Sequence, residues 1–227
     1  MSESLNRLLA DLHAQRVATW ESAALQVNID QRRRLVDEAR VEDFVSVGDT
    51  LEPFTLVTVE GGSLSRDELL AKGPAVLIFF RFAGCPACNI ALPYYQRQLY
   101  PSLHALGVPL VAVSPQVPER LVEIKSRHNL ELQVVSDPNN QLGRRLGILY
   151  SFDEASRKAS LLKGSSIGEI TGTGTWELPQ PTVVVIDRDG TVAFAEVSPD
   201  WLVRTEADRV IQAVEQLLGQ SPVQVAI

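Results

Sequence analysis

The order of hydrophobic and polar residues predicts a chain in which strands and helices alternate. From residue 75 onward, apolar runs of strand length are separated by segments in which apolar residues recur at helical spacing. Strands are expected at 75–80, 108–113, 132–135, 182–186 and 191–197, and helices at 86–104, 117–127, 139–146 and around 210–218. Continuous apolar strands that alternate with helices are typical of parallel βαβ units, so the pattern predicts an α/β fold.

The segments that flank this core follow other patterns. Residues 1–45 are expected to form a helical extension, because Leu5, Leu8, Leu9 and Leu12 recur at helical spacing and Asp30 can cap a second helix. The main domain is then expected over 46–219, followed by a loosely held tail at 220–227.

Two features lie inside the main domain. Residues 54–59 alternate as in a β-hairpin that precedes the main sheet, and Asp187–Gly190 is a hairpin turn before the last strand. Residues 151–178 are rich in Ser, Gly and Thr, and we expect an inserted loop with one short helix.

Composition and charge exclude several classes of function. The chain has 227 residues, is 45% hydrophobic and 22% charged, and carries a net charge of −7. This charge disfavours nucleic acid and an anionic membrane surface as partners. The one basic run, Arg32–Arg34, is interpreted as the solvated face of a helix. No signal-like start and no apolar stretch of about 20 residues is found, so we expect a cytoplasmic protein in a reducing compartment.

The two cysteines, Cys85 and Cys88, follow the strand expected at 75–80 and open the next helix. The first turn of a helix has unpaired N–H groups and a partial positive charge, which stabilise a thiolate and lower its pKa below about 8.5. Pro86 suits the first helical position, and the spacing places the second sulfur about one turn along, close enough for a disulfide. We therefore predict a redox-active pair.

A structural disulfide and a zinc site are the alternatives. A reducing compartment disfavours a disulfide, and so small a loop would add little stability. Zinc needs four ligands, and the histidines His13, His104 and His128 are scattered along the chain. Redox chemistry without a metal or another cofactor is favoured over both.

Two further candidates precede the strand at 182–186. Pro181 is either part of a rigid trans start to the strand or a cis proline that faces the cysteines and holds backbone groups ready to pair with an extended substrate. Trp176, where the insert rejoins the sheet, is either a packing anchor or a residue that lines the substrate approach beside Pro181.

Together with this order of elements, several segments resemble the thioredoxin superfamily and, more closely, the peroxiredoxin-like branch of the alkyl hydroperoxide reductase/thiol-specific antioxidant (AhpC/TSA) family. The segments that carry the resemblance are VGD (47–49), FTL (54–56), FFR (79–81), CPACN (85–89), VSPQ (113–116), VSD (135–137), WELP (176–179) and VIDRDG (185–190). The resemblance covers residues 47 to 200 and implies a thioredoxin-like three-layer fold, with a central mixed sheet flanked by helices. It also implies that a cysteine thiolate reduces hydroperoxides, becoming a sulfenic acid and then a disulfide.

This chain departs from the family patterns at the site. Peroxiredoxins carry Pro-x-x-x-Thr-x-x-Cys; here Arg81 and Cys85 stand at the Pro and Thr positions and Cys88 at the attacking cysteine. Pro181 stands where those enzymes place an arginine that polarises the peroxide, so Arg81 is the candidate guanidinium. Thioredoxins keep a buried acid in the first strand, where this chain has Phe79. The peroxiredoxin pattern favours Cys88 as the attacking thiolate and the thioredoxin pattern favours Cys85; we favour Cys85, which we expect to be the more exposed.

Three functions follow as hypotheses. The first is a peroxiredoxin-like peroxidase that acts on hydroperoxides and is restored by a thioredoxin-type partner or a small thiol. The second is a thiol–disulfide oxidoreductase that acts on protein or small-molecule disulfides. The third is an interaction module without turnover. The helical extension is expected to pack on its own domain or on the second subunit of a homodimer.

Overall fold

The centre of the computed structural model, which describes residues 3–164 and 166–220, is a seven-stranded mixed sheet in the order β2-β1-β5-β4-β3-β8-β9. Its strands are β1 (Thr55–Thr58), β2 (Ser63–Ser65), β3 (Ala75–Phe79), β4 (Leu110–Ser114), β5 (Gln133–Ser136), β8 (Thr182–Ile186) and β9 (Val192–Val197). Strands β3, β4 and β5 run parallel, and the other neighbours pair antiparallel. Every residue of β3, β4 and β8 is buried, as expected for strands covered on both faces.

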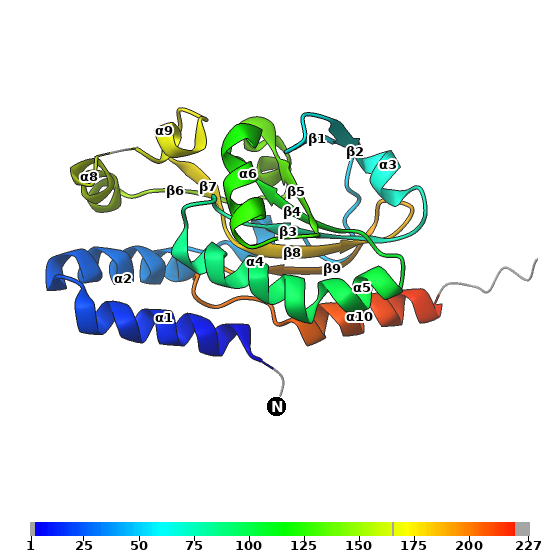
Figure 1. Cartoon of the computed structure of the whole chain (residues 1–227), viewed down its shortest axis with the longest axis horizontal. Helices are drawn as coiled ribbons and strands as arrows, with labels where there is room; N and C mark the ends of the chain where they lie inside the picture. Colours follow the sequence, from blue (N-terminus) through cyan, green and yellow to red (C-terminus); the bar gives the residue numbers. More distant parts are fainter. Residues whose placement is uncertain (1–2, 165, 221–227) are drawn as a thin grey trace, which may run out of the picture.

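Helices cover both faces of this sheet (Figure 1). They are α1 (Leu5–Thr19), α2 (Ser22–Asp37), α3 (Arg66–Leu70), α4 (Pro86–Gln98), α5 (Tyr100–Ala105), α6 (Pro118–Arg127), α7 (Gln141–Arg145), α8 (Glu154–Leu162), α9 (Ile167–Thr171) and α10 (Ala207–Gln220). One apolar cluster joins α1, α4, α6 and α10 to one face of the sheet, and a second joins α3 and α7 to the other face. The predicted three-layer fold with a central mixed sheet is therefore confirmed.

The β-hairpins follow the predicted pattern. Strands β1 and β2 form the early hairpin, which continues the main sheet because β1 also pairs with β5. Strands β8 and β9 are joined by the expected turn, in which Gly190 adopts φ +92°. A positive φ of this kind favours glycine, which explains why the turn ends in Asp-Gly.

The N-terminal helices α1 and α2 form an antiparallel pair at the lower left of Figure 1. Leu5 and Leu9 are fully buried in the cluster that contains α4, so α1 packs on its own chain. The second helix begins at Ser22 rather than after Asp30, which lies inside it and accepts hydrogen bonds from Gln26 and Arg33.

The basic run at 32–34 is not simply a solvated face. Arg32 forms a two-pronged, partly buried ion pair with Asp200, with N–O distances of 2.7 and 2.8 Å. The pair ties α2 to the loop that precedes α10, because a guanidinium matches the geometry of a carboxylate.

Two further helical predictions need correction. The helix expected over 86–104 is divided at Leu99 into α4 and α5, since Pro101 in the first turn of α5 has no N–H to continue the hydrogen-bond ladder. The insert expected as a loop with one helix contains both α8 and α9, and it is closed by a ribbon of β6 (Leu149–Ser151) and β7 (Glu177–Pro179). Side-chain caps start both helices: Asp153 accepts from the N–H of Ser156, and Ser166 forms a capping box with Glu169.

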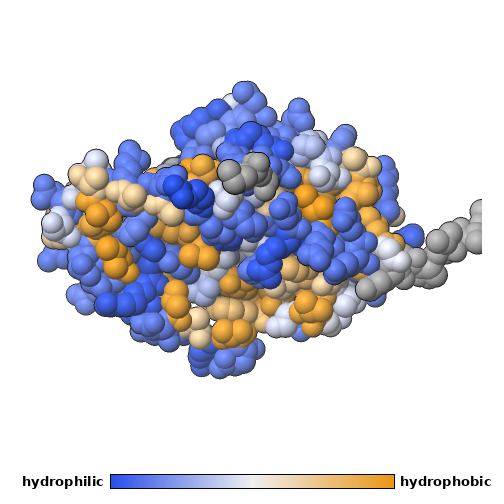
Figure 2. Space-filling model, turned by 90° about the horizontal axis from the view of Figure 1, so that it is seen from below, coloured by the Kyte–Doolittle hydropathy of each residue, from blue (hydrophilic) through white to orange (hydrophobic). Residues whose placement is uncertain are grey.

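Seen from below Figure 1, the surface mixes hydrophilic areas with separate hydrophobic patches (Figure 2). Within residues 3–164 and 166–220, no helix is long and apolar enough to cross a bilayer. The tail predicted at 220–227 lies outside the described residues except for Gln220, the last residue of α10.

Candidate active site

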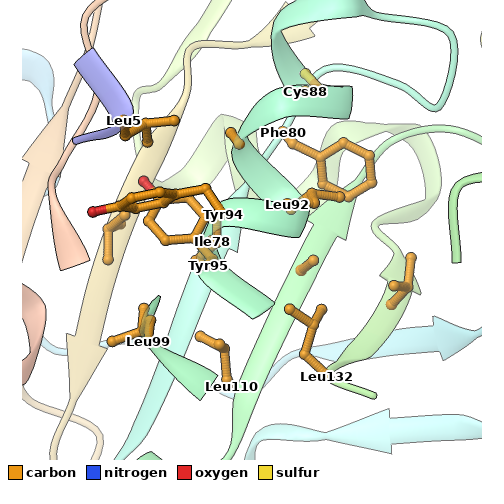
Figure 3. Packing of buried hydrophobic residues seen from close by; sticks show 14 of the residues in the cluster. Leu5, Ile78, Phe80, Cys88, Leu92, Tyr94, Tyr95, Leu99, Leu110 and Leu132 are labelled. Carbon is orange, nitrogen blue, oxygen red and sulfur yellow. The ribbon is translucent and has the colours of Figure 1, made fainter. Parts of the chain in front are cut away.

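Cys85 and Cys88 lie where the buried strand β3 leads into α4. Cys85 is the N-cap residue of α4 and Pro86 opens its first turn, as the sequence predicts. The carbonyl of Cys85 accepts hydrogen bonds from the N–H groups of Cys88 and Asn89, both at 3.0 Å. Figure 3 shows Cys88 at the start of α4, close to Phe80 and Leu92 of the buried cluster.

The loop that carries Cys85 is held from two sides. The Asn89 side chain donates to the carbonyls of Ala83 and Cys85 at 2.7 and 2.9 Å. Gln116, in the loop after β4, accepts the N–H of Ala83 at 2.8 Å, and Ser114, the last residue of β4, donates to the carbonyl of Arg81 at 3.1 Å. The conformation of the cysteine loop is therefore fixed by its neighbour in the parallel sheet.

The two sulfurs are reduced and almost completely covered. Cys85 is 1% exposed and Cys88 is 0% exposed, so the greater exposure expected of Cys85 amounts to only 1% and neither cysteine is open to solvent. The cause is the close packing of the loop against the apolar cluster, to which both side chains belong. Exposure therefore does not distinguish an attacking from a resolving cysteine.

Electrostatics does distinguish them. A guanidinium nitrogen of Arg204 lies 3.5 Å from the sulfur of Cys88. Burial by itself raises the pKa of Cys88, but the hydrogen bond from Cys85 and the positive charge of Arg204 lower that pKa well below its usual value. The hydrogen bond to Cys88, burial and the neighbouring negative charge raise the pKa of Cys85. The contact with Arg204 thus favours a thiolate on Cys88 over a thiolate on Cys85.

The N-terminal helix holds Arg204 in place. The Asn6 side chain accepts the backbone N–H of Arg204 at 2.9 Å and donates to its carbonyl at 2.8 Å. The guanidinium also donates to the carbonyl of Trp201 at 3.0 Å. The extension thus fixes the backbone of Arg204, the residue whose guanidinium faces Cys88.

Arg81, which the sequence suggests as the guanidinium that acts on the peroxide, lies close to the cysteines and is surrounded by aromatic rings. Its guanidinium carbon is 4.4 Å from the ring centroid of Trp201 and 5.7–5.9 Å from the rings of Phe82, Tyr150 and Phe152. Its charge interacts with both sulfurs. Cation–π contacts of this kind hold a buried guanidinium without an acidic partner.

The structure selects the trans form of Pro181. Among the described residues no peptide bond is cis, so the alternative of a cis Pro181 is wrong. The carbonyl of Pro181 accepts the N–H of Ser198 at 2.8 Å in the β8–β9 hairpin, and it is therefore not free to pair with an extended substrate. Pro181 lines the same small internal space as Arg204, on the side of β8.

Trp176 packs within the insert. The centroid of the Trp176 ring is 5.9 Å from that of the Phe152 ring. The guanidinium carbon of Arg157 lies 5.6 Å from the same Trp176 centroid. The carbonyl of Trp176 accepts the N–H of Phe152 at 3.2 Å. These contacts match the packing anchor that was one of the two interpretations of this residue.

Two arginines near the cysteines, Arg204 and Arg16, were not predicted from the sequence. Arg204 lies in an irregular loop without any pattern that marks it. Arg16 is buried on α1, and its charge interacts with Cys85 and Arg81. A signal for Arg16 exists, because it continues the apolar stripe of Leu5, Leu9 and Leu12 at helical spacing. No cluster of three metal-ligating side chains occurs in the part of the chain that the structure describes.

Known proteins with similar sequences include thiol-dependent redox proteins. The model of the AhpC/TSA family matches residues 47–195. A putative peroxiredoxin bcp of Haemophilus influenzae is 27% identical over 110 residues, which are 46% of this chain and 66%, just under two thirds, of that protein. The thiol-disulfide oxidoreductase ResA of Geobacillus kaustophilus is 24% identical over 174 residues, covering 75% of this chain and 79% of the relative.

Solved structures show the same fold. Peroxidoxin BcpB of Mycobacterium tuberculosis superposes with a TM-score of 0.59 at 19% identity, covering 76% of this chain and 98% of that one. Reduced Prx3 of Vibrio vulnificus, solved in complex with H2O2, gives a TM-score of 0.60 at 22% identity, covering 75% of this chain and 99% of the other.

Proposed function

Because the chain belongs to the AhpC/TSA family, we propose that it is a thiol peroxidase in which Cys88 attacks hydroperoxides and Cys85 resolves the product. The observation that carries the proposal is the guanidinium of Arg204, 3.5 Å from the Cys88 sulfur. A thiolate is the nucleophilic form of cysteine, and a fixed positive charge beside it also stabilises the negative charge that develops on the leaving oxygen.

The cycle balances with the groups of this site and an external thiol. The Cys88 thiolate attacks the peroxide; an S–O bond forms, the O–O bond breaks, and the alkoxide takes a proton and leaves as alcohol. Cys88 is then a sulfenic acid. The sulfur of Cys85 attacks it; an S–S bond forms, the S–O bond breaks, and the proton of Cys85 leaves with hydroxide as water. A thioredoxin-type dithiol or two small thiols supply two electrons that restore the pair, and a reducing compartment such as the cytoplasm maintains this resting state.

The burial of both sulfurs defines what must move. A peroxide reaches the Cys88 sulfur only when side chains or loops around it shift, because Cys88 is 0% exposed. Formation of the disulfide requires a second local rearrangement, because the sulfur of Cys85 must leave its hydrogen bond and attack along the S–O bond.

A thiol–disulfide oxidoreductase is the second candidate, favoured by the similarity to ResA over 75% of this chain. The occupied carbonyl of Pro181 and the absence of an exposed sulfur speak against a docked protein disulfide. Small disulfides are the substrates that this alternative retains.

Stopped-flow measurements on the wild type, Cys88→Ser and Cys85→Ser separate these functions. We expect Cys88→Ser to abolish peroxide consumption, and Cys85→Ser to consume one equivalent at a near wild-type rate without forming a disulfide. The reverse pattern would reassign the attacking cysteine. Rapid reduction of a small disulfide such as oxidised glutathione, with no peroxide consumption, would favour the second candidate, and inertness in both assays would favour an interaction module.

A further inference from the structure

A cavity of about 340 Å³ lies between the N-terminal helices, the cysteine loop and the insert. Helices α1 and α2 form one wall, α8 and α9 form another, and Gly84 and Pro86, on either side of Cys85, form the end. Its volume is that of a small-molecule site. Both N-terminal helices lie outside the segment 47–195 that matches the family model, so one wall of the cavity comes from outside that segment and the others come from within it.

Several buried polar groups that line the cavity have no hydrogen-bond partner. They include a terminal guanidinium nitrogen of Arg16, Nε of Arg81, the side-chain nitrogen of Gln31 and the hydroxyl of Ser156, on residues that are no more than 8% exposed. The half-buried Asn28 adds an amide oxygen. A buried donor without a partner is costly, and a group of them around one space indicates a ligand that supplies acceptors.

The charge of this space is positive, although the chain as a whole carries −7. No carboxylate of the described residues forms an ion pair with Arg16 or Arg81. The Cys88 thiolate offsets one positive charge at most, and Arg204 already contacts it. Two guanidiniums buried without a counter-charge match an anion that binds from outside.

The remaining walls are apolar. Aromatic rings of Trp20, Phe82, Phe152 and Trp201 line the cavity between the arginines and the insert. Guanidiniums are suited to the two oxygens of a carboxylate, and flat aromatic walls are suited to an apolar body. Arg81 both lines the cavity and interacts with the two sulfurs, so a ligand held there lies next to the redox pair.

We propose that this cavity binds the carboxylate and the apolar body of an organic hydroperoxide and directs the peroxide toward the cysteine pair. The reduction of the bound hydroperoxide rests on the proposed peroxidase function. The preference of the site for anionic ligands rests on the cavity alone. It assigns Arg16, Arg81 and Gln31 as the groups that select anionic over neutral hydroperoxides.

The turnover test compares 4-carboxycumene hydroperoxide with its methyl ester. We expect kcat/KM of the wild type to be about tenfold or more higher for the acid, because charge-assisted hydrogen bonds are lost with the ester. Arg16→Gln is expected to reduce this ratio severalfold, because only Arg81 and Gln31 then remain to select the acid, and Arg16→Lys is expected to reduce it less. Arg7→Gln, an exposed arginine on the same helix, is the matched control and keeps the wild-type ratio. An equal or higher kcat/KM for the ester in the wild type would overturn the inference.

A binding test does not depend on turnover. Calorimetry with the doubly substituted Cys85→Ser/Cys88→Ser chain measures binding of the corresponding hydroxy acid, 4-(2-hydroxypropan-2-yl)benzoate, and of its methyl ester. Preferential binding of the acid, reduced in Arg16→Gln and unchanged in Arg7→Gln, supports the cavity even if no hydroperoxide is consumed, and only the peroxidase proposal then fails. Equal or undetectable binding of acid and ester refutes the cavity even if H2O2 is consumed.

Discussion

Glu206 joins the N-terminal helix to the loop that carries Arg204, and its replacement by glutamine tests how firmly the two are connected. Its carboxylate accepts hydrogen bonds from the Ser4 hydroxyl, the backbone N–H groups of Leu5 and Asn6, the Asn6 side chain and the Tyr94 hydroxyl, at 2.7–2.9 Å. It thus caps the first turn of α1 with a negative charge, where the helix dipole favours one.

The size of the effect follows from the pKa of this carboxyl. Partial burial by itself raises the pKa of Glu206, but the hydrogen bonds from Asn6, Leu5, Ser4 and Tyr94 lower it from 4.5 to about 2. Such a shift corresponds to about 3 kcal/mol for a group shielded from water. Glu206 is partly exposed, so we expect Glu206→Gln to lower the free energy of unfolding by about 1–2 kcal/mol. For a chain of this size that is a decrease in Tm of about 2–8 °C.

The pH dependence gives the prediction its sign. Because the pKa is lower in the folded than in the unfolded chain, the stabilisation is complete above pH 4.5 and is lost as the pH falls toward about 2. The difference in unfolding free energy between wild type and variant is therefore largest at pH 7 and shrinks on acidification. Urea unfolding followed by circular dichroism measures it at each pH.

The control is Glu38→Gln, which removes an exposed carboxylate 3.7 Å from Arg34. Its effect is expected to stay within about 0.5 kcal/mol. The reasoning is refuted if Glu206→Gln is no more destabilising than this control at pH 7, or if its effect does not decrease as the pH is lowered.

Three other substitutions probe the site and the fold. Arg204→Met removes the positive charge beside Cys88 and is expected to raise the pKa of that thiol. Peroxide consumption should then be about tenfold slower on the acidic side of the pH profile, and stopped-flow measurements would show the acid limb shifted to higher pH. An acid limb at the wild-type pH would contradict the role assigned to Arg204. Leu9→Ala opens a cavity where α1 packs on the core, because Leu9 is fully buried. A urea titration is expected to show a free energy of unfolding lower by about 3 kcal/mol. A loss below about 1 kcal/mol would mean that α1 is not part of the core. Gly147 adopts φ +69°, and Gly147→Ala would place a methyl group against the backbone oxygen of Asp43. Calorimetry is expected to show a free energy of unfolding lower by about 2 kcal/mol or more. An unchanged Tm would exclude this close approach.

The sheet and the position of the cysteines were predictable because local signals and the fold agree. Parallel strands buried on both faces must be continuously apolar, so the runs near 75–80 and 108–113 correspond to β3 and β4 within two residues. A helix must begin after β3, and Pro86 marks its first turn.

The surroundings of the sulfurs were less predictable. The contact between Cys88 and Arg204 joins residues 116 positions apart, across a loop with no periodic pattern. The burial of Cys85 depends on how its loop packs against the apolar cluster, and the Cys-x-x-Cys motif alone does not predict that packing. The insert is different: its Ser- and Gly-rich composition suggests a loop, yet Ser166 followed by Glu169 is a readable capping box for α9.

The assignment of Cys88 as the stabilised thiolate is tested most directly by the pKa values of the two cysteines. The variants Cys85→Ser and Cys88→Ser each retain one thiol, and the serine at position 85 keeps a hydroxyl that can donate to the Cys88 sulfur. Alkylation rates with iodoacetamide over a pH series give each pKa. We predict that the pKa of Cys88 in Cys85→Ser lies below the usual value of about 8.5 for a free cysteine. In Cys88→Ser the Cys88 sulfur no longer raises the pKa of Cys85, but burial still does, and we predict that this pKa lies above that of Cys88. A lower pKa for Cys85 than for Cys88 would contradict the account.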